Sequence, residues 1–572
     1  MYKNKEPWKN LEVYKGKYFS GQWPTLPELF NITADKFPDR KCFSTYGPDL
    51  FFTYREAHSK ILSVANYLKK MGVKKGDKVA VTGKNSPEWS IAYLSIMYAG
   101  ATVVPLDYQL HSKEITALLD FSGASILFVD EEKFDEVSAL NNKLTLISLA
   151  PEKKNYILNL DDPGEIPGEM PLEADLAAIL FTSGTTGNQK GVMLTQSNFV
   201  SDCFLAQGHM ALTEEDVFYA LLPLHHSYSM LAVFIEAISV GAEIVFAKKL
   251  VVSQILKDLK VGKVTMFLAI PMLFNKMLKA LMNGIKEKGI VIYGIIRFLM
   301  FVSGFIKKTT GINPGKKMFK GLLAKLSLDT NRICICGGGP LPASTFKMFN
   351  QLGIDFVQGY GLTETSPIIA LNPVEHYKED SVGAVTPGTE MKILDPDETG
   401  SGEILVKGPM VMQGYYNNQE ATDEIFNEDG WLKTGDVGYL DDENFLYLTG
   451  RKKTLIVTEG GKNVFPEEIE DHFQLFDEIE QVLVRGYVLD DKMKTEGIEA
   501  LIFPNEEFQK KQFEKVNLGY DKENIKLEFD KIIEQVNREL LPYKRISKLR
   551  VLDKAMEMTT TKKIKRFKVL AD

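Results

Sequence analysis

Residues 78–106, KVAVTGKNSPEWSIAYLSIMYAGATVVPL, predict a strand, a helix and a second strand in succession. Ser86 and Pro87 mark the start of the helix, because serine caps exposed N–H groups and proline fits the first helical position. The helix should end near Gly100, and the apolar residues that follow form the second strand. A β-α-β crossover of this kind is right-handed and joins parallel strands, so we expect a parallel sheet.

The same alternation of helix and strand continues along the chain. Further parts of a layered α/β body are expected at a helix, 113–121, and at strands 124–129, 177–181, 217–222 and 333–336. After about residue 381, short strands between Gly, Pro and Asp turns indicate a more antiparallel lobe. From residue 481, two strand-like runs and an amphipathic helix at 522–541 indicate a small α+β domain at about 452–572.

Length and composition describe a globular protein of several lobes. The chain has 572 residues, against about 150 for a usual domain, and 44% of them are apolar. A net charge of −8 argues against a general nucleic-acid binder. The four cysteines match neither a disulfide framework nor a CxxC metal pair, and the amino terminus lacks an apolar signal segment. We therefore expect buried thiols and a cytoplasmic protein.

The strongest local motif is FTSGTTGNQKG at residues 181–191. Its glycines let backbone N–H groups approach phosphate oxygens, its hydroxyls add donors, and Lys190 adds positive charge. The order of a Walker loop is absent, because Lys190 is followed by glycine rather than by serine or threonine. The loop predicts a triphosphate site, with an ordinary glycine turn between two strands as the alternative.

Two further motifs complete a nucleotide site. In QGYGLTET, 358–365, Tyr360 suits a base, Thr363 a phosphate oxygen, and Glu364 a Mg²⁺ ion. In GWLKTGD, 430–436, the terminal aspartate suits ribose hydroxyls, and GRKK follows with a guanidinium fifteen residues later. Each motif alone is a weak signal, since a hairpin turn would also explain it.

Together, in this order, TSGTTGNQKG, GYGLTET, TGD and GRKK resemble the adenylate-forming superfamily of acyl-CoA ligases, peptide-synthetase adenylation domains and luciferases. The resemblance covers about residues 25–568. It implies a large multi-lobed amino-terminal domain, 1–451, of layered α/β sheets with a distorted β-barrel lobe. It also implies a small mobile α+β domain, 452–572, that swings between two poses.

The resemblance implies a role for each matching residue. The residues implied to bind ATP or AMP are Thr182, Ser183, Gly184, Thr185, Thr186, Gly187, Lys190, Gly338, Gly339, Pro340, Gly359, Tyr360, Gly361, Asp436 and Arg451. Thr363 and Glu364 are implied to act on the α-phosphate, Glu364 through Mg²⁺. Lys453 matches the hinge between domains, and Gly461 the glycine that lines the tunnel for coenzyme A.

The last motif, EMTTTKKIKR at 557–566, contains the implied catalytic lysine. The family places one lysine directly before an aliphatic residue and a basic pair, which matches Lys563. A positioned ammonium there would stabilise the charge that accumulates when a carboxylate attacks the α-phosphorus. Many relatives have Ser-Gly before this lysine, whereas Thr561 and Lys562 precede it here, so Lys562 is a rival. A solvated basic tail is the other alternative.

The segment LPLHHSYS, 222–229, matches the region where relatives place the acyl pocket. His226 is implied to line that pocket, with a packed histidine as the alternative. Adjacent histidines on a strand point in different directions, so we do not expect a metal pair. No aspartate stands beside an aromatic residue here to bind an amino group, which argues against an amino-acid substrate.

A closer resemblance is to long-chain fatty acid–CoA ligases, through residues 336–342, 450–458 and 559–566. The function implied is activation of a long-chain fatty acid to acyl-AMP with release of pyrophosphate, then transfer to coenzyme A. ATP, Mg²⁺ and coenzyme A are the implied cofactor and substrates. The alternatives are transfer to an acyl carrier protein, a medium-chain or aryl acid substrate, and a membrane acyl-binding protein without catalysis.

One basic segment, 276–325, has eleven basic side chains and one acidic one. Within it, 289–306 is apolar and near the length of a membrane span, but Arg297 at its centre opposes insertion. We expect a helix that lies in a membrane interface, or one that packs on the body with its lysines outward. Peripheral contact with an anionic membrane and a homodimer are the partners that we expect.

Overall fold

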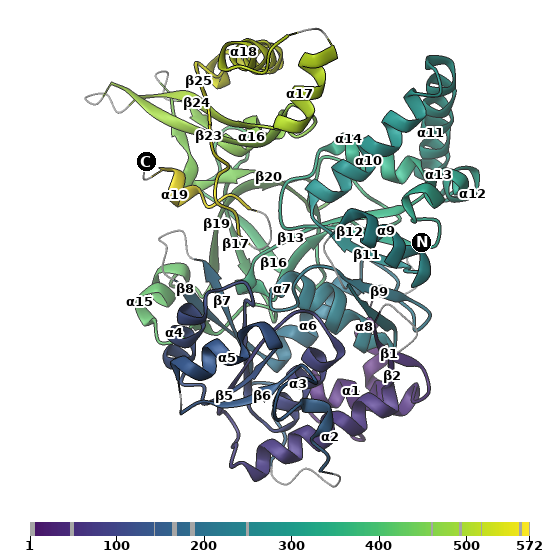
Figure 1. Ribbon diagram of the computed structural model, residues 1–572, viewed down its shortest axis with the longest axis vertical. Coiled ribbons are helices and arrows are strands. Elements are labelled where there is room, and N and C mark those ends of the chain that lie inside the picture. The colour runs from purple at the N-terminus through teal and green to yellow at the C-terminus, as the bar shows by residue number, and fades with distance from the viewer. Residues whose placement is uncertain are drawn as a thin grey trace. The chain divides into compact units, whose positions relative to one another are not determined.

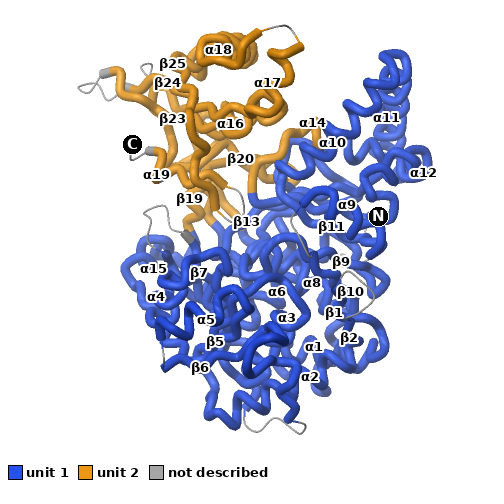
Figure 2. The backbone as a smooth tube through the Cα atoms, viewed as in Figure 1, with its two compact units in different colours: residues 1–338, 346–390, 406–432 blue, residues 339–345, 391–405, 433–572 orange. Residues whose placement is uncertain are grey.

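The computed structural model describes residues 6–45, 51–141, 143–162, 169–183, 189–247, 251–458, 462–490, 495–515, 518–559 and 563–570. The chain forms two compact units (Figure 2). The first comprises 1–338, 346–390 and 406–432, and the second 339–345, 391–405 and 433–572. The second unit thus includes strands that precede residue 452. A functional boundary at 451/452 stays a prediction.

The predicted β-α-β unit is confirmed as β3 (Lys78–Thr82), α3 (Pro87–Tyr98) and β4 (Thr102–Leu106). The hydroxyl of Ser86 accepts a hydrogen bond from the N–H of Trp89 at 3.1 Å, as a helix cap should. Gly100 ends the helix region with a φ of +78°, which favours glycine. The strands pair in parallel, and every residue of α3 is buried.

The first sheet of unit 1 has the strand order β18-β8-β7-β4-β3-β5-β6, and Figure 1 labels β5, β6, β7 and β8 of this sheet. Its other strands are β5 (Ile126–Val129), β6 (Thr145–Ser148), β7 (Leu176–Ser183), β8 (Gln189–Thr195) and β18 (Gly414–Tyr415). Its helix α4 (Ser112–Ser122) precedes β5 as predicted. Because β7 and β8 are antiparallel neighbours, the glycine-rich motif connects the two strands of a hairpin.

The second sheet of unit 1 has the order β15-β14-β13-β12-β11-β9-β10-β1-β2. Its strands are β1 (Lys41–Thr45), β2 (Phe51–Thr53), β9 (Val217–Ala220), β10 (Glu243–Phe246), β11 (Met266–Ala269), β12 (Ile333–Cys336), β13 (Asp355–Gly361), β14 (Ile368–Leu371) and β15 (Gly383–Val385). Pairing is parallel from β1 through β10, β9, β11 and β12 to β13, and antiparallel from β13 to β15. All four cysteines are buried free thiols.

Unit 2 has two groups of strands. One has the order β16-β17-β19-β20, with β16 (Glu390–Leu394), β17 (Gly402–Lys407), β19 (Leu432–Leu440) and β20 (Phe445–Arg451). The other has β23 (Ile479–Asp490), β24 (Thr495–Pro504) and β25 (Lys548–Val551), covered by α18 (Lys522–Glu539), whose buried face includes Phe529 and Ile533. The α+β character predicted for this part of the chain is confirmed.

The apolar segment of the basic region forms α11 (Ile290–Thr310), which follows α10 (Pro271–Lys286) in unit 1. Length and composition alone would let α11 cross a membrane, and it is the one such helix among the described residues. The expectation that its lysines point outward is wrong for Lys307. That side chain is buried against Asp355, because its ammonium replaces water with three oxygen partners of the protein.

Candidate active site

The β7–β8 hairpin positions the ends of the glycine-rich motif. Thr182 lies opposite Lys190 in the register, and Ser183 ends β7. Gly191 has no room for a side chain, since a Cβ there would lie 2.9 Å from Cγ2 of Ile179. The predicted phosphate residues Gly184, Thr185, Thr186 and Gly187 lie outside the described residues. The strands that flank the motif are therefore fixed in the first unit.

Tyr415 in β18 connects two predicted site residues. The ammonium of Lys190 lies 4.6 Å from the centroid of its ring, within range of a cation–π contact. Its hydroxyl donates a hydrogen bond to Oε1 of Glu364 at 2.8 Å. Burial and the Glu364 carboxylate raise the pKa of Tyr415, so the phenol remains a donor. Sequence reasoning did not single out Tyr415, because a buried tyrosine next to a glycine is an ordinary strand residue.

The GYGLTET motif spans the end of β13 and a tight turn. A Cβ on Gly361 would lie 1.6 Å from the carbonyl oxygen of Pro367, so only glycine fits there. Gly359 is also crowded, by Leu371 at 3.0 Å, and Tyr360 lies between these two glycines at a shift in the β13–β14 register. The close backbone approach explains the glycine pattern.

Thr363 and Glu364 follow in the helical turn Thr363–Thr365. The Thr363 hydroxyl lies 3.2 Å from that of Ser227, and the backbone oxygen of Glu364 accepts from the N–H of Met412 at 2.9 Å. Of the two carboxylate oxygens of Glu364, only Oε1 has a hydrogen-bond partner among the described residues. The half-buried carboxylate can thus offer Oε2 to a hard cation, and a carboxylate with substrate phosphates is the ligand set that Mg²⁺ prefers.

Asn85, in the turn between β3 and α3, fixes the segment 220–224. Its Nδ2 donates to the carbonyl oxygens of Ala220 at 3.1 Å and Leu222 at 2.7 Å. Its Oδ1 accepts from the N–H of Leu224 at 2.9 Å. One amide therefore holds the start of the predicted acyl-pocket segment. The sequence had indicated Asn85 only as part of a helix start.

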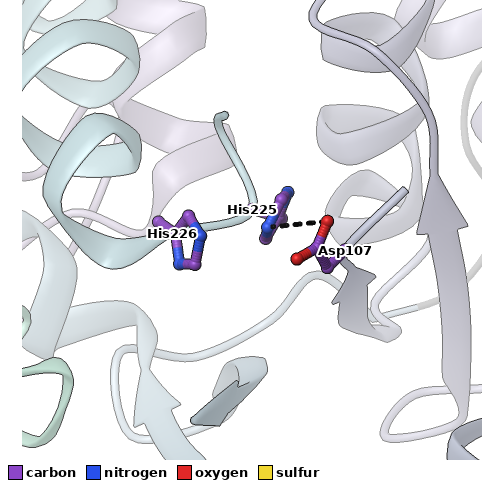
Figure 3. Close-up of side chains that lie close together, drawn as sticks. All are labelled: Asp107, His225 and His226. Carbon is purple, nitrogen blue, oxygen red and sulfur yellow. Dashed lines mark ion pairs between the residues drawn. The ribbon is translucent and has the colours of Figure 1, made fainter. Parts of the chain in front are cut away.

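The two histidines of that segment do not point apart. Their ring centroids are 4.3 Å apart, in a loop between β9 and the short helix Ser227–Ser229. The expectation was wrong because the strand ends at Ala220 and the chain then turns. Figure 3 shows Asp107 beside them, with its Oδ1 3.7 Å from Nε2 of His225.

The ligand atoms of this cluster are spaced more widely than those of a bound zinc ion. Burial works to raise the pKa of Asp107, but the contact with His225 holds the pKa below its ordinary value. The ligand atoms of Asp107, His225 and His226 lie within 4.8 Å of one another. A tetrahedral zinc shell would bring such atoms to about 3.4 Å. His226 itself is half-buried, at the start of the helical turn.

The second unit brings together the two residues implied for ribose. Asp436 and Arg451 are opposite each other in the β19–β20 register, and Nε of Arg451 lies 3.0 Å from Oδ1 of Asp436. Gly339 and Pro340 also belong to this unit, where the carbonyl oxygen of Pro340 accepts from Gln474 at 3.3 Å. Gly338 belongs to the first unit, is exposed, and has a φ of +79°. The predicted nucleotide residues are thus divided between the units.

Lys563 follows these residues in the same unit. Desolvation, followed by the charge of Arg451, lowers the pKa of its ammonium to about 8, while Asp436 opposes the shift. The side chain still has solvent-exposed surface, so water limits this shift. The backbone N–H donates to the Thr559 hydroxyl at 3.1 Å, and Met558 bridges to Ile564. Lys563 is electrostatically coupled to the pair implied for ribose.

The other basic residues of the tail have different partners. Lys565 and Lys568 both pair with Glu557, and Arg566 lies 2.5 Å from Glu470. Those three charges are neutralised locally, which argues against a merely solvated tail. Lys562, the rival of Lys563, lies outside the described residues.

Lys453 lies in the helical turn Lys452–Thr454, directly after β20. Its neighbour Lys452 binds Glu403 at 2.8 Å, and the hydroxyl of Thr454 donates to Glu467 at 3.1 Å. The turn is therefore held on both sides of Lys453. Gly461, implied for the coenzyme A tunnel, lies outside the described residues.

Comparison with known proteins places these features in a family. The model of the AMP-binding enzyme family matches residues 30–416. A long-chain-fatty-acid–CoA ligase of Mycobacterium bovis is 30% identical over 564 residues, 91% of this chain and 90% of that protein. A chloroplastic long-chain-fatty-acid–[acyl-carrier-protein] ligase of Arabidopsis thaliana is 26% identical, over 96% of this chain and 86% of that protein.

Solved structures agree with this match. The o-succinylbenzoate coenzyme A synthetase of Bacillus subtilis, in complex with ATP and magnesium, has a TM-score of 0.73 and 25% identity. The alignment covers 95% of this chain and 99% of that one. The same synthetase in complex with its acyl-adenylate intermediate has a TM-score of 0.74. By the family model, the relatives and the fold, this chain belongs to the AMP-binding enzyme family.

Proposed function

We propose that the protein is an AMP-forming acid–coenzyme A ligase whose acid is a long-chain fatty acid. In the first step a carboxylate oxygen bonds to the α-phosphorus of ATP, and the bond to pyrophosphate breaks. In the second step the coenzyme A thiol, on losing its proton, bonds to the acyl carbon, and AMP leaves. The observation that supports this most directly is the pair of Arg451 and Asp436, 3.0 Å apart, whose charges act on Lys563.

The described residues provide the groups that such a first step needs. Lys190, held over the Tyr415 ring, offers charge to phosphate oxygens. Glu364, oriented by the Tyr415 hydroxyl, offers a carboxylate oxygen to Mg²⁺. When bound, that ion neutralises charge on the phosphates. Lys563 adds a positive charge, which stabilises the negative charge of the attacking carboxylate and phosphoryl group.

The long-chain substrate is supported by the named activity of the Mycobacterium bovis relative. The one carboxylate in the cluster of Asp107, His225 and His226 faces the ring of His225, so it is not an isolated partner for a substrate amino group. Two rivals come from the other likenesses: an aryl acid, as in the o-succinylbenzoate synthetase, and a carrier-protein acceptor, as in the Arabidopsis ligase. We also propose that Gly461 lines the tunnel for coenzyme A and that Lys453 is the hinge between the domains.

We also propose that the enzyme is cytoplasmic and that it contacts an anionic membrane peripherally. We further propose that it forms a homodimer. Four buried free thiols suit a reducing compartment. A long-chain acid partitions into bilayers, so an enzyme that uses one gains from a place at the membrane surface.

The test is a panel of acids with ATP and Mg²⁺, in which pyrophosphate release and thioester formation are measured separately. Saturated long-chain, medium-chain and benzoic acids are each supplied with coenzyme A, with a phosphopantetheinyl carrier protein, or with neither. We expect pyrophosphate release to be fastest with the long chains, and thioester only with coenzyme A. Thioester formed only on the carrier protein would reassign the acceptor. A faster rate with benzoic acids would reassign the substrate.

A further inference from the structure

The outer face of α11 is apolar and exposed, although it belongs to a well-packed unit. Val291 is 71% exposed, Phe298 64% and Phe305 62%. Only 17% of the most apolar window of this helix is buried. In Figure 1, α11 lies at the outer edge of the first unit, with α10 and α12 (Gly315–Met318) beside it. Exposed apolar patches of this kind mark interaction surfaces.

The opposite face of the same helix is the one that holds it in place. Met300, Ser303 and Lys307 are the buried residues of α11. Phe298 and Lys307 are nine residues apart, which is about two and a half turns, so they lie on opposite sides of the helix. The helix therefore has an inward face with polar anchors and an outward face of large apolar side chains.

The anchoring is specific. Nζ of Lys307 lies 2.7 Å from Oδ1 of Asp355 and 2.8 Å from Oδ1 of Asn350. It also donates to the carbonyl oxygen of Ile354 at 3.3 Å. Burial lowers the pKa of Lys307, and the Asp355 charge opposes that shift. A helix fixed in this way along its inner side cannot turn its apolar face into the core.

Exposed lysines flank α11 along the chain. Lys288 precedes the helix, and Lys317, Lys320 and Lys325 follow it in the chain; all are exposed. Across the described ranges, no carboxylate lies within ion-pair distance of these four side chains, whereas the nearby Lys308 pairs with Glu379 at 3.1 Å. Contact with the Lys288 side chain lowers the pKa of Lys325, as expected where like charges lie near each other.

We propose that the outer face of α11 and these four lysines form a docking surface for an anionic phospholipid bilayer. The apolar side chains enter the boundary between headgroups and acyl chains, and the lysines contact headgroup phosphates. The helix lies along the bilayer rather than across it, because its inner face remains packed on the protein. The unpaired lysines favour this occupant over a second copy, whose identical surface would place like charges together. This docking proposal does not depend on which acid the active site binds.

Vesicle co-sedimentation of the full chain tests the surface. Phosphatidylserine–phosphatidylcholine vesicles and pure phosphatidylcholine vesicles are compared at low and at high salt. Two variants separate the apolar contribution to vesicle binding from the electrostatic one. The first changes Phe298 and Phe305 to glutamine, and the second changes the four lysines to glutamine. Each lysine near an anionic surface is worth about fivefold in binding. We therefore expect the lysine variant to bind at least about tenfold more weakly, and to lose most of its salt dependence.

The apolar variant should lose the part of the binding that high salt leaves. Matched controls lie elsewhere on the surface. Glutamine at the exposed Lys74, Lys113, Lys143 and Lys154 changes the net charge equally, and glutamine at Leu140 and Leu527 removes exposed apolar groups. These controls should bind vesicles as the parent does. Circular dichroism and turnover of a short water-soluble acid should be unchanged in every variant.

Three results would overturn the proposal. The parent could fail to bind anionic vesicles at low salt. Both variants could bind them as well as the parent. Sedimentation without lipid could show a dimer that dissociates when Phe298 and Phe305 are changed, with no vesicle binding by the parent, which would make the face a contact between copies. Pyrophosphate release reports on the active site independently, so the proposed activity can fail or stand separately.

Discussion

Replacement of Lys563 by alanine should separate the two half-reactions. The charges of Arg451 and Asp436 act on the ammonium, and removal of a preorganised donor of this kind costs about 3–4 kcal/mol. Adenylation should therefore fall by about two to three decades, as measured by acid-dependent exchange of pyrophosphate into ATP. Thioester formation from supplied acyl-AMP should survive, because the small domain is expected to present Lys563 only in the first pose.

The pH dependence of the adenylation rate is a second test of the role of Lys563. The active form of Lys563 is protonated, and its pKa is lowered from the ordinary value to about 8. Adenylation should thus decline at a lower pH than it would with an ordinary lysine, whose pKa is about 10.4. Arginine at this position keeps its charge, so Lys563→Arg should lose that alkaline decline even if its rate is low.

Two outcomes would refute this reasoning. A larger adenylation defect in Lys562→Ala than in Lys563→Ala would show that the motif was aligned one residue too late. Equal loss of both half-reactions in Lys563→Ala, with an unchanged thermal unfolding transition, would show that the lysine does not act in the first step alone.

Three further perturbations follow from the geometry. Proline at Lys453 fixes φ near −65° and should trap one pose, so one half-reaction should fall far more than the other; equal loss in a folded protein would count against the hinge. Tyr415→Phe removes a donor to a carboxylate, worth about 1.5–3 kcal/mol, so a magnesium titration of adenylation should shift to higher concentrations; an unchanged titration would contradict this role. Lys307→Met leaves the carboxylate of Asp355 without its main cation. Because Asp355 is partly exposed, urea unfolding should show a loss of up to about 3 kcal/mol, and no loss would mean that the pair is not needed.

Much of the fold could be predicted because local signals agree with tertiary packing. The cap at Ser86, the glycine at Gly100 and the apolar strands on either side specify one β-α-β unit without help from distant residues. Parallel pairing followed from handedness. The small sheet of unit 2 was predicted less fully. Its strand Lys548–Val551 has only four residues, which is too short a stretch for its alternation of polar and apolar residues to mark a strand.

The sequence indicates candidate site residues where motifs are contiguous, and it does not reveal contacts between distant segments. Glu364 and Tyr415 are separated by fifty-one positions, and no periodicity connects them. Asn85 binds a segment more than one hundred positions away. Lys307 was expected at the surface because a lysine in a basic segment usually is solvated. Its burial depends on Asp355, which only the folded chain brings within reach.

The fate of the carboxylate oxygens tests the proposed chemistry most directly. A long-chain acid labelled with heavy oxygen in its carboxylate is turned over with ATP, Mg²⁺ and coenzyme A, and the products are analysed by mass spectrometry. Attack on the α-phosphorus leaves one labelled oxygen on AMP when the thiol displaces it, so labelled AMP and unlabelled pyrophosphate are expected. Label in inorganic phosphate, with ADP as the nucleotide product, would contradict an acyl-adenylate and the account built on Lys563.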